Sequence, residues 1–457
     1  MNLKKPLIIS ITTLFILSMT GFSCQNPNEK TEEITLTIWG VYDNSADLKD
    51  IISSYEKLHP NIHVRYYKKV YEDYERELLG TLAAGKGPDI FFIHNTWLPK
   101  YSDKIMALTD VTPPVFSPLR EEQRKGCMRS STIPPTQHFI GAKEYWRTYV
   151  DVVSENFTSN GKIYAVPLAC DTLALYYNKE LFKRAEITDP PGIPNPPKTW
   201  EDFKDDVEKL TVLDEKGNIK RAGATLGTAK NINRSTDILT LLMLQSGTQM
   251  TNSEHTRATF NQMVRNYYPG QTALQFYTDF ANPAKRVYTW NPNMEYSIDA
   301  FYQGKAAMMF NYSYHIPTIR AKAPKLDFGV APVPQIKGSG EDVNFANYWG
   351  LTVSRKSPNK PIAWDFIMFA SQKENVRKYV KKTKRPSARR DLIEEQKSDE
   401  DLGVFAAQVL SAKSWYVVDQ KSVETIFAEM IESVVLRRAT PREAINLAAA
   451  QVSRLMR

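Results

Sequence analysis

The chain has 457 residues, of which 42% are hydrophobic and 24% charged, which is enough for a large core divided between two domains. Three cysteines are too few for a fold held together by disulfides. The 59 basic residues outnumber the 51 acidic ones, but the densest basic run, over 381–390, is short and interrupted by Pro386. We therefore expect a solvated loop or helix end there and no nucleic-acid partner, which would need the excess charge gathered on one face.

The first 24 residues have the pattern of an export signal. Basic residues precede an apolar stretch over 6–22, and Cys24 follows it after small residues. The segment resembles a bacterial lipoprotein signal peptide, which is cleaved before a cysteine that then carries lipid, here Cys24. A retained transmembrane anchor is the alternative, and either would hold the protein on the outer face of the cytoplasmic membrane, periplasmic or at the cell surface. Residues 25–33 are polar and predict a flexible tether.

Strands and helices alternate in the next segment. The expected elements are strands over 34–39, 61–67 and 89–94 and helices over 46–58 and 72–84. This βαβαβ order predicts an α/β lobe with a mainly parallel sheet, in which ligands bind at the carboxyl ends of the strands. Trp39, Asn95 and Trp97 lie at or just past those ends.

The stretch 161–182 holds two apolar runs, over 163–168 and 173–177, on either side of a small polar group that includes Asp171 and Thr172. Polar residues between two buried strands are costly unless something pairs with them. The group is therefore either a surface loop or the place where the chain crosses from one lobe to another and faces the cleft.

Polar and aromatic residues also stand at strand ends and in loops of the second half. Further helices are expected over 145–153, 201–210, 235–246, 273–280, 297–303, 361–371, 423–436 and 441–456, and strands over 222–227, 306–310, 328–333 and 351–354. Tyr312, Ser313 and Tyr314 follow the strand 306–310, and Trp349 precedes the strand 351–354. Trp290 lies in an aromatic loop, and Trp415 and Tyr416 interrupt the C-terminal helices.

Several of these segments carry a family pattern. The matching residues are Gly161, Lys162, Tyr164, Pro167, Tyr177, Asn178, Lys179, Leu181 and Phe182, followed by Pro197–Phe203 and Phe301–Met308. They resemble the bacterial extracellular solute-binding proteins of ABC transporters, specifically the maltose-binding-protein-like group of carbohydrate-binding lipoproteins (family 1). The resemblance extends along nearly the whole chain.

The resemblance implies an α/β, two-lobed periplasmic-binding-protein-like fold of type II. Each lobe would be a mainly parallel sheet flanked by helices, and three hinge crossings, near Asp171, Tyr312 and Trp349, would join the lobes. The expected lobe 1 comprises 34–170 with 313–348, and lobe 2 comprises 171–312 with 349–457.

Local patterns of known catalytic and cofactor sites are missing from the sequence. It contains no H-E-x-x-H, G-x-S-x-G, P-loop or G-x-G-x-x-G pattern, and Pro60 separates His59 from His63. We therefore expect no catalytic residue, no metal and no cofactor, although a pair of glycosidase carboxylates stays open. A disulfide between Cys127 and Cys170 also stays open, because sequence does not give proximity.

The candidate ligand-binding residues are aromatic, amide, hydroxyl and carboxyl side chains at the expected cleft. They are Trp39, Asn95, Trp97, Asp171, Thr172, Trp290, Tyr312, Ser313, Tyr314, Trp349, Trp415 and Tyr416. Core packing is the plain alternative for any single one of them. As a set they suit a sugar, whose apolar face lies flat on aromatic rings and whose hydroxyl groups need fixed donors and acceptors.

These observations favour a non-enzymatic, membrane-anchored solute-binding component of an ABC importer. It would capture a carbohydrate, in first place an oligosaccharide, by hinge closure, act as a monomer and deliver its cargo to permease subunits. One alternative keeps the fold but binds a peptide, a polyamine or a glycerol-phosphate compound. Another is a secreted carbohydrate-active enzyme.

Overall fold

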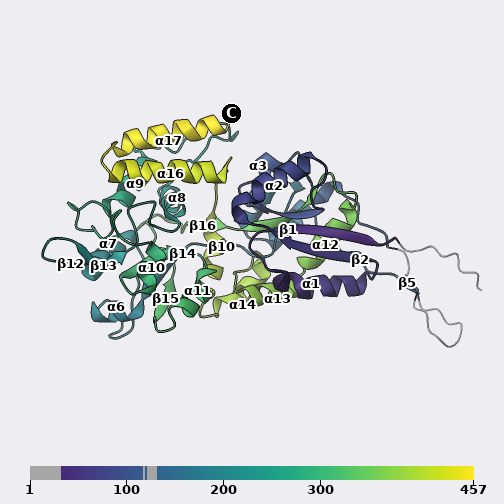
Figure 1. The fold of residues 1–457 in the computed structure, drawn as a ribbon, viewed down its shortest axis with the longest axis horizontal. Helices are drawn as coiled ribbons and strands as arrows, with labels where there is room; N and C mark the ends of the chain where they lie inside the picture. The colour runs from purple at the N-terminus through teal and green to yellow at the C-terminus, as the bar shows by residue number, and fades with distance from the viewer. Residues whose placement is uncertain (1–31, 117–118, 121–130) are drawn as a thin grey trace, which may run out of the picture.

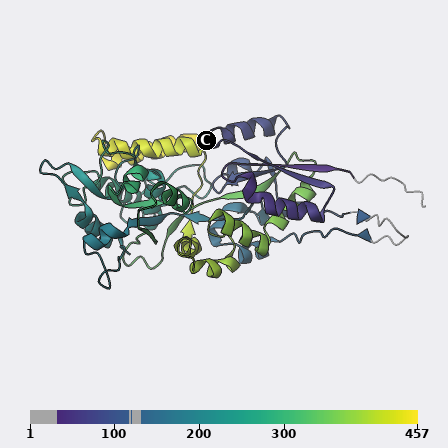
Figure 2. The ribbon, with the colours of Figure 1, turned by 60° about the horizontal axis from the view of Figure 1, so that its bottom comes forward.

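The computed structural model describes residues 32–116, 119–120 and 131–457. The signal segment 1–24 with Cys24, most of the tether and Cys127 lie outside the described residues, and the pairing of Cys127 with Cys170 lies outside them as well. Figures 1 and 2 show two lobes joined at a narrow middle. The two-lobed α/β architecture is therefore confirmed.

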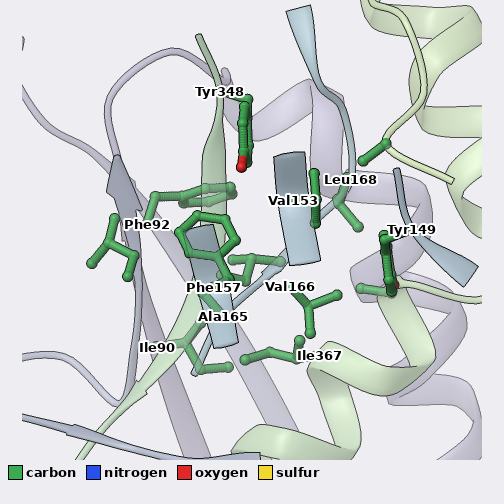
Figure 3. Packing of buried hydrophobic residues seen from close by; sticks show 14 of the residues in the cluster. Ile90, Phe92, Tyr149, Val153, Phe157, Ala165, Val166, Leu168, Tyr348 and Ile367 are labelled. Atoms are coloured by element: carbon green, nitrogen blue, oxygen red, sulfur yellow. The ribbon is translucent and has the colours of Figure 1, made fainter. Parts of the chain in front are cut away.

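The sheet of lobe 1 contains the N-terminal strands. Its strands follow the order β2 (Ile62–Lys68), β1 (Ile34–Gly40), β3 (Ile90–His94), β17 (Trp349–Ser354) and β4 (Ile105–Met106), and β9 (Val166–Pro167) pairs with β17. β1 runs parallel to β2 and β3, as its βαβαβ pattern predicts, whereas β17 is antiparallel to β3, β4 and β9. The core of this lobe takes its buried side chains from 36–170 and 346–412, and Figure 3 shows the part around Phe157 and Val166.

Lobe 2 is built on a second, mixed sheet. Its strands follow the order β12 (Val212–Leu213), β13 (Ile219–Ala224), β14 (Ala306–Asn311), β11 (Ala174–Asn178) and β15 (Phe328–Ala331). β13 and β14 are parallel, but β11 is antiparallel to both β14 and β15. The core of this lobe takes its side chains from 173–345 and 415–452.

The expectation of mainly parallel sheets is wrong where a strand follows directly on a lobe crossing. β1 and β3 end at the cleft, whereas β17 begins there, so that Trp349 pairs with His94 at the end of β3. β11 likewise begins opposite Asn311, where β14 ends. A strand that enters its lobe from the cleft must run against neighbours that end at the cleft, because no crossover helix has turned the chain round.

Helices cover both sheets. In lobe 1 they are α1 (Ser45–Leu58), α2 (Tyr71–Ala83), α3 (Leu98–Tyr101), α4 (Ala142–Thr148), α5 (Asp151–Phe157), α12 (Lys360–Ala370) and α13 (Lys373–Thr383). In lobe 2 they are α6 (Lys179–Arg184), α7 (Trp200–Leu210), α8 (Ser235–Gln245), α9 (Pro269–Asp279), α10 (Ser297–Tyr302), α11 (His315–Lys322), α16 (Gln420–Val435) and α17 (Pro441–Leu455). The remaining short elements are η1 (Leu108–Asp110), β5 (Leu119–Arg120), β6 (Ser131–Thr132), β7 (Thr158–Ser159), β8 (Lys162–Ile163), η2 (Arg390–Leu392), α14 (Ile393–Lys397), α15 (Gly403–Gln408) and η3 (Val409–Ser411).

Local sequence signals explain most helix boundaries. Thr199 and Thr440 each form a capping box at the start of α7 and α17, and the Asn178 side chain accepts from the first turn of α6. The helix expected over 145–153 is instead two short helices. Its backbone is diverted at Tyr149 and Val150, which pair with the segment 388–389.

Three short strands carry the chain between the lobes. They are β10 (Asp171–Thr172), β16 (Asn344–Asn347) and β18 (Ala412–Lys413), which pair in the order β10-β16-β18. The crossings expected near Asp171 and Trp349 are therefore present, the second one just before Trp349. The crossing expected near Tyr312 is wrong, and the third lies at β18.

The expected division of the chain into lobes changes accordingly. β15 pairs with β11 in the second sheet, so most of 313–348 belongs to lobe 2 rather than lobe 1. β17, α12 and α13 pack in the first core, so most of 349–411 belongs to lobe 1 rather than lobe 2, although Phe405 of α15 packs against Tyr176 of the second lobe. The last stretch, from 413, returns to lobe 2. The strand that a segment forms, and not a sequence motif, decides in which lobe it packs.

Across the described ranges, no helix combines the length and the apolar character that spanning a bilayer requires.

The close approach of β17 to its neighbours gives a test of the core. A Cβ added at Gly350 would lie 2.5 Å from the Phe157 ring and 3.1 Å from the Ala165 side chain, both fully buried. We expect Gly350→Ala to lower the free energy of unfolding by about 1–3 kcal/mol, because the overpacked sheet must shift. Urea unfolding followed by circular dichroism measures this change.

The same substitution at Gly80 is the matched control. Apart from the neighbouring backbone of α2 itself, no atom lies within 4 Å of a Cβ added there, in the interior of that helix. Gly80→Ala should raise the free energy of unfolding by about 0.5–1 kcal/mol through helix propensity. Equal effects of the two substitutions would contradict the packing described for β17.

Candidate functional site

A cavity of about 310 Å³ opens between the two lobes. Lobe 1 contributes the loop after β1 with Tyr42 and Asp43, together with Trp349 and Arg385. Lobe 2 contributes Arg234, Tyr312 and Tyr314, and the crossing strands contribute Asp171 and Asn347. The cavity thus has one wall from each lobe and a floor made by the crossings.

Trp349 is the centre of an aromatic cluster that forms the wall of lobe 1. Its ring lies 5.1 Å from Trp97, 5.3 Å from His94, 5.7 Å from Tyr42 and 5.9 Å from Tyr74, measured between ring centres. Such edge-to-face packing fixes the ring orientation. Trp349 therefore presents a rigid apolar surface to the cavity.

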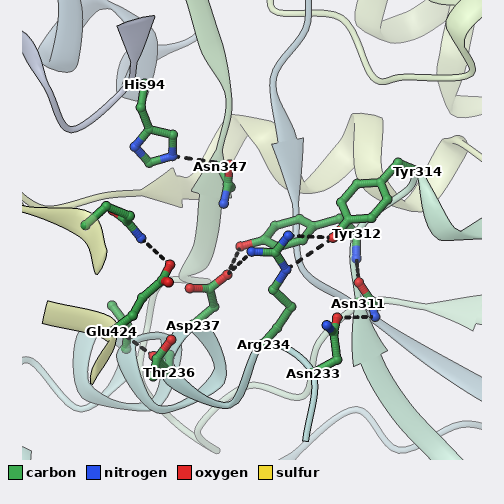
Figure 4. Close-up of polar contacts among 12 residues, drawn as sticks. His94, Asn233, Arg234, Thr236, Asp237, Asn311, Tyr312, Tyr314, Asn347 and Glu424 are labelled. Carbon is green, nitrogen blue, oxygen red and sulfur yellow. Dashed lines mark hydrogen bonds and ion pairs between the residues drawn. The ribbon is translucent and has the colours of Figure 1, made fainter. Parts of the chain in front are cut away.

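The wall of lobe 2 combines two tyrosines with an arginine (Figure 4). The rings of Tyr312 and Tyr314 are stacked 6.0 Å apart. Arg234 donates to the Tyr314 hydroxyl from Nε at 3.1 Å and from Nη2 at 2.7 Å, and its guanidinium lies 5.4 Å from the Tyr312 ring centre. Asp237 accepts the Tyr312 hydroxyl at 2.8 Å, and burial raises the pKa of its carboxyl. These contacts hold both tyrosines in place.

Arg234 itself has a left-handed backbone, with φ 61° and ψ 23°, just before α8. This conformation is unfavourable for residues other than glycine, asparagine and aspartate. Residues held in such strained conformations are concentrated at functional sites. In this conformation the Arg234 side chain donates to the Tyr314 hydroxyl from the start of α8.

The floor carries hydrogen-bonding groups. The Asp171 carboxylate accepts from the Thr172 N–H at 2.9 Å, the Ser313 N–H at 3.1 Å and the Ser313 hydroxyl at 2.7 Å. Asn347, directly opposite Asp171 in the β10–β16 pair, has its Oδ1 3.3 Å from Nε2 of His94.

A buried ion pair completes the lobe 1 side. Arg385 Nη1 lies 2.6 Å from the Asp43 carboxylate, which also accepts the Tyr379 hydroxyl at 2.9 Å. Arg385 comes from the basic run 381–390, so the expectation of a solvated loop or helix end fails for its arginines. Arg389 and Arg390 of the same run pair with Asp391 and Asp151. All three arginines thus form ion pairs within the fold, and Arg385 also lines the cavity.

Four of the predicted site residues line the cavity: Asp171, Tyr312, Tyr314 and Trp349. Three others support these four from behind. Trp97 packs against Trp349, and the Ser313 hydroxyl and the Thr172 N–H both donate to Asp171.

The other five predicted residues do not line the cavity. Trp290 is fully buried in the core of lobe 2, and Trp415 stacks on Phe427 in that same core. Tyr416 packs on His255, and Trp39 lies under the Lys69 ammonium, 3.7 Å from its ring centre. Asn95 donates to the Ser414 hydroxyl at 2.7 Å, beside the third crossing. These five side chains therefore pack in the fold or bond to neighbouring residues, which is the alternative to ligand binding given above.

The sequence interpretation missed Tyr42, Asp43, Arg234, Asn347 and Arg385. Tyr42 and Asp43 follow the carboxyl end of β1, where ligands of such sheets bind. The reasoning that selected Trp39 could therefore have found them a few residues further along the loop. Arg234 and Arg385 reach the cavity through tertiary packing, for which no local signal exists.

The site can bind a molecule with apolar faces and hydroxyl edges. Rings stand on two sides, while Asp171, Asn347, Arg234 and Arg385 supply acceptors and donors. In the described part of the chain, no group of three or more His, Cys, Asp and Glu residues is placed to hold a metal ion.

Comparisons with known proteins agree with this architecture. Residues 42–377 match the family described as bacterial extracellular solute-binding protein. A binding protein of Brucella abortus is 23% identical over 425 residues, which cover 90% of this chain and 89% of the relative. The galactooligosaccharide-binding protein of Bacillus subtilis is 21% identical over 418 residues, or 91% of this chain and 87% of the relative.

A solved structure shows the same fold. The cyclic alpha-maltosyl-1,6-maltose binding protein from Arthrobacter globiformis superposes with a TM-score of 0.71 at 20% identity, covering 92% of this chain and 98% of that one.

The environment of Asp171 predicts a pH dependence of stability. Burial raises the pKa of its carboxyl from 3.8 to about 6, against the hydrogen bonds from Ser313 and Thr172 that lower it. Between about pH 4 and 6 the native state therefore keeps a proton that the unfolded chain has released. The stabilisation from this group is complete below pH 4 and is lost, by about 3 kcal/mol, as the pH rises through 6.

Asp171→Asn removes this titration. Urea unfolding from pH 4 to pH 7 should show the wild type losing stability relative to the variant as the pH rises. Asp342→Asn, in an exposed loop, is the control and should follow the wild-type profile. Parallel curves for the wild type and Asp171→Asn would contradict the buried environment of this carboxyl.

Proposed function

The chain belongs to the bacterial extracellular solute-binding proteins, and from this premise we propose that it captures a neutral carbohydrate between its lobes for an ABC importer. The observation that carries the proposal is the cavity, with aromatic rings on both walls and hydrogen-bonding groups on its floor. The sugar-binding names of relatives with nearly the same length support it.

The charges of the cavity favour a neutral ligand. Arg385 is paired with Asp43 at 2.6 Å, and Arg234 lies 3.9 Å from Asp237. A glycerol-phosphate compound would need an uncompensated cation, and a polyamine would need uncompensated carboxylates. Each cavity arginine already has a carboxylate beside it, and among the described lining residues Asp171 is the one carboxylate bonded only to neutral donors, whereas a polyamine needs several. A polyol with donors and acceptors therefore fits the site better than either ion.

Capture would proceed by closure of the lobes around the crossings. A sugar that contacts Trp349 on one lobe and Tyr314 on the other stabilises the closed arrangement by its differential affinity for it. β10, β16 and β18 are the short segments that would absorb the motion.

The enzyme alternative finds less support at this site. A glycosidase needs one carboxyl group as acid and another as nucleophile or base, each able to reach the substrate. Asp43 is bonded to Arg385 and Tyr379, and Asp171 to Ser313 and Thr172. Each of these carboxylates therefore already has polar partners within the protein, an arrangement that suits holding and orienting a ligand.

The remaining parts of the proposal concern location and partners. We propose that Cys24 carries the lipid that anchors the protein outside the cytoplasmic membrane, and that the closed form docks as a monomer on the permease subunits. Labelling of cells with a radioactive fatty acid tests the anchor, because Cys24→Ser should abolish incorporation. Incorporation that persists in the variant would contradict it.

Thermal unfolding of the purified protein with a panel of ligands tests the function. A ligand that binds only the folded state adds about 2.7 kcal/mol at a hundredfold excess over its dissociation constant. We expect a neutral mono- or oligosaccharide to raise the midpoint and to remain intact on prolonged incubation. A shift with glycerol 3-phosphate or a polyamine only, or turnover of the sugar, would contradict the proposal.

Trp349 should contribute most of the stacking. We expect Trp349→Leu to weaken sugar binding at least tenfold, because truncated aromatic anchors at binding sites cost about 2 kcal/mol or more. Isothermal titration calorimetry measures the change. Trp146→Leu, at a half-exposed position of α4 away from the cavity, is the control and should leave affinity unchanged. Equal losses from the two variants would contradict a role for the Trp349 surface.

A further inference from the structure

Two side chains on the crossing strands stand next to each other on the cavity floor. Asp171 of β10 and Asn347 of β16 are direct partners in an antiparallel pair, and both line the cavity. Side chains directly opposite each other in such a pair lie on the same face, with Cβ atoms about 4.5–5.5 Å apart. A carboxylate and an amide are therefore presented together.

His94 decides which end of the Asn347 amide faces the cavity. Its Nε2 lies 3.3 Å from Oδ1 of Asn347, and its Nδ1 lies 2.8 Å from the Thr96 hydroxyl. An amide oxygen only accepts hydrogen bonds, so Nε2 carries the proton and Nδ1 accepts from Thr96. Figure 4 shows this contact, and the His94 ring is held against Trp349.

The Asn347 Nδ2 group is consequently turned away from His94. Within the described part of the chain it makes no hydrogen bond to protein, and Asn347 is half-buried. Asp171 also has capacity left, because a carboxylate has about four acceptor positions and three N–H and O–H groups of Thr172 and Ser313 bond to it. The floor thus offers one acceptor beside one donor.

We propose that Asp171 and Asn347 together recognise two neighbouring hydroxyl groups of the sugar, and that His94 is the positioning residue for this pair. One hydroxyl donates to the Asp171 carboxylate, and its neighbour accepts from Nδ2 of Asn347. The inference rests on the proposed function, which it refines to sugars with two adjacent unsubstituted hydroxyls at this subsite.

The orientation of the amide is what makes the pair selective. If Asn347 were reversed, two acceptors would stand side by side, and a hydroxyl that must accept a hydrogen bond would find no donor. A site built to bond a hydroxyl rejects an analogue that lacks it, because its own polar group is then left unpaired. His94 keeps the donor in place.

The test compares a sugar that binds with its monodeoxy and O-methyl analogues, by calorimetry. For the wild type we expect removal of either of the two hydroxyls to weaken binding about tenfold or more. Asn347→Ala should bind the parent sugar more weakly and no longer distinguish the analogue that lacks the accepting hydroxyl. His94→Phe keeps a ring against Trp349 but cannot donate to Oδ1 of Asn347, so it should bind the parent sugar and the analogue that lacks the accepting hydroxyl equally well. His94→Gln can donate to Oδ1 and should again bind the parent sugar more tightly than that analogue.

Asn261→Ala, at a half-buried position, and His63→Phe, at an exposed one, both lie outside the cavity. They are the matched controls and should keep the wild-type pattern. Full discrimination by His94→Phe would overturn its positioning role. Wild-type protein that binds the parent and every monodeoxy analogue equally would overturn the paired recognition while the proposed function stands. The comparison of deoxy sugars on the wild-type protein needs no variant, so it tests the paired recognition even if a substituted protein fails to fold. If no sugar binds at all, the proposed function fails and this inference fails with it.

Discussion

The pairing of β10 with β16 is the interaction on which the rest of the structure depends. These two short strands carry the chain between the lobes, and their register sets Asp171 opposite Asn347. Because β11 and β17 continue directly from them, both strands enter their sheets at the cleft and run against their neighbours. One local pairing thereby fixes the direction of a central strand in each lobe and the position of the floor between them.

The cavity also illustrates how buried charge is made tolerable. Arg385 meets Asp43, and Arg234 lies over Tyr312 with its donors on the Tyr314 hydroxyl. An isolated charge in such a place would cost several kcal/mol, whereas a charge with partners can hold neighbouring rings and still offer unused N–H groups. The paired arginines therefore make the cavity walls both polar and rigid. Rigid walls keep the distance between the aromatic rings and the hydrogen-bonding groups constant, as binding of a small ligand requires.

Much of the fold could be predicted from the sequence, because it depends on local patterns. The alternation over 34–94, the caps at Thr199 and Thr440 and the polar group at Asp171 each act through neighbours in the chain. The lobe assignment after Tyr312 was wrong, since β15 and β17 carry no mark of the sheet that they join. For the site the same limit applied: strand ends pointed to Asp171, Tyr312, Tyr314 and Trp349, but Trp290 and Trp415, which look alike in sequence, proved to be core residues.

The sequence by itself determined the family pattern, the two-lobed class and the type of side chain that a sugar site needs, because hydrophobic periodicity, turn residues and motif spacing are properties of short segments. Only the tertiary structure decided where the third crossing lies, which rings face the cleft and which arginines reach it. Those outcomes depend on contacts such as Arg385 with Asp43, separated by 342 positions in the chain, and no local signal encodes a partner at that distance. The orientation of Asn347 belongs to the same group, since His94 sets it from another strand.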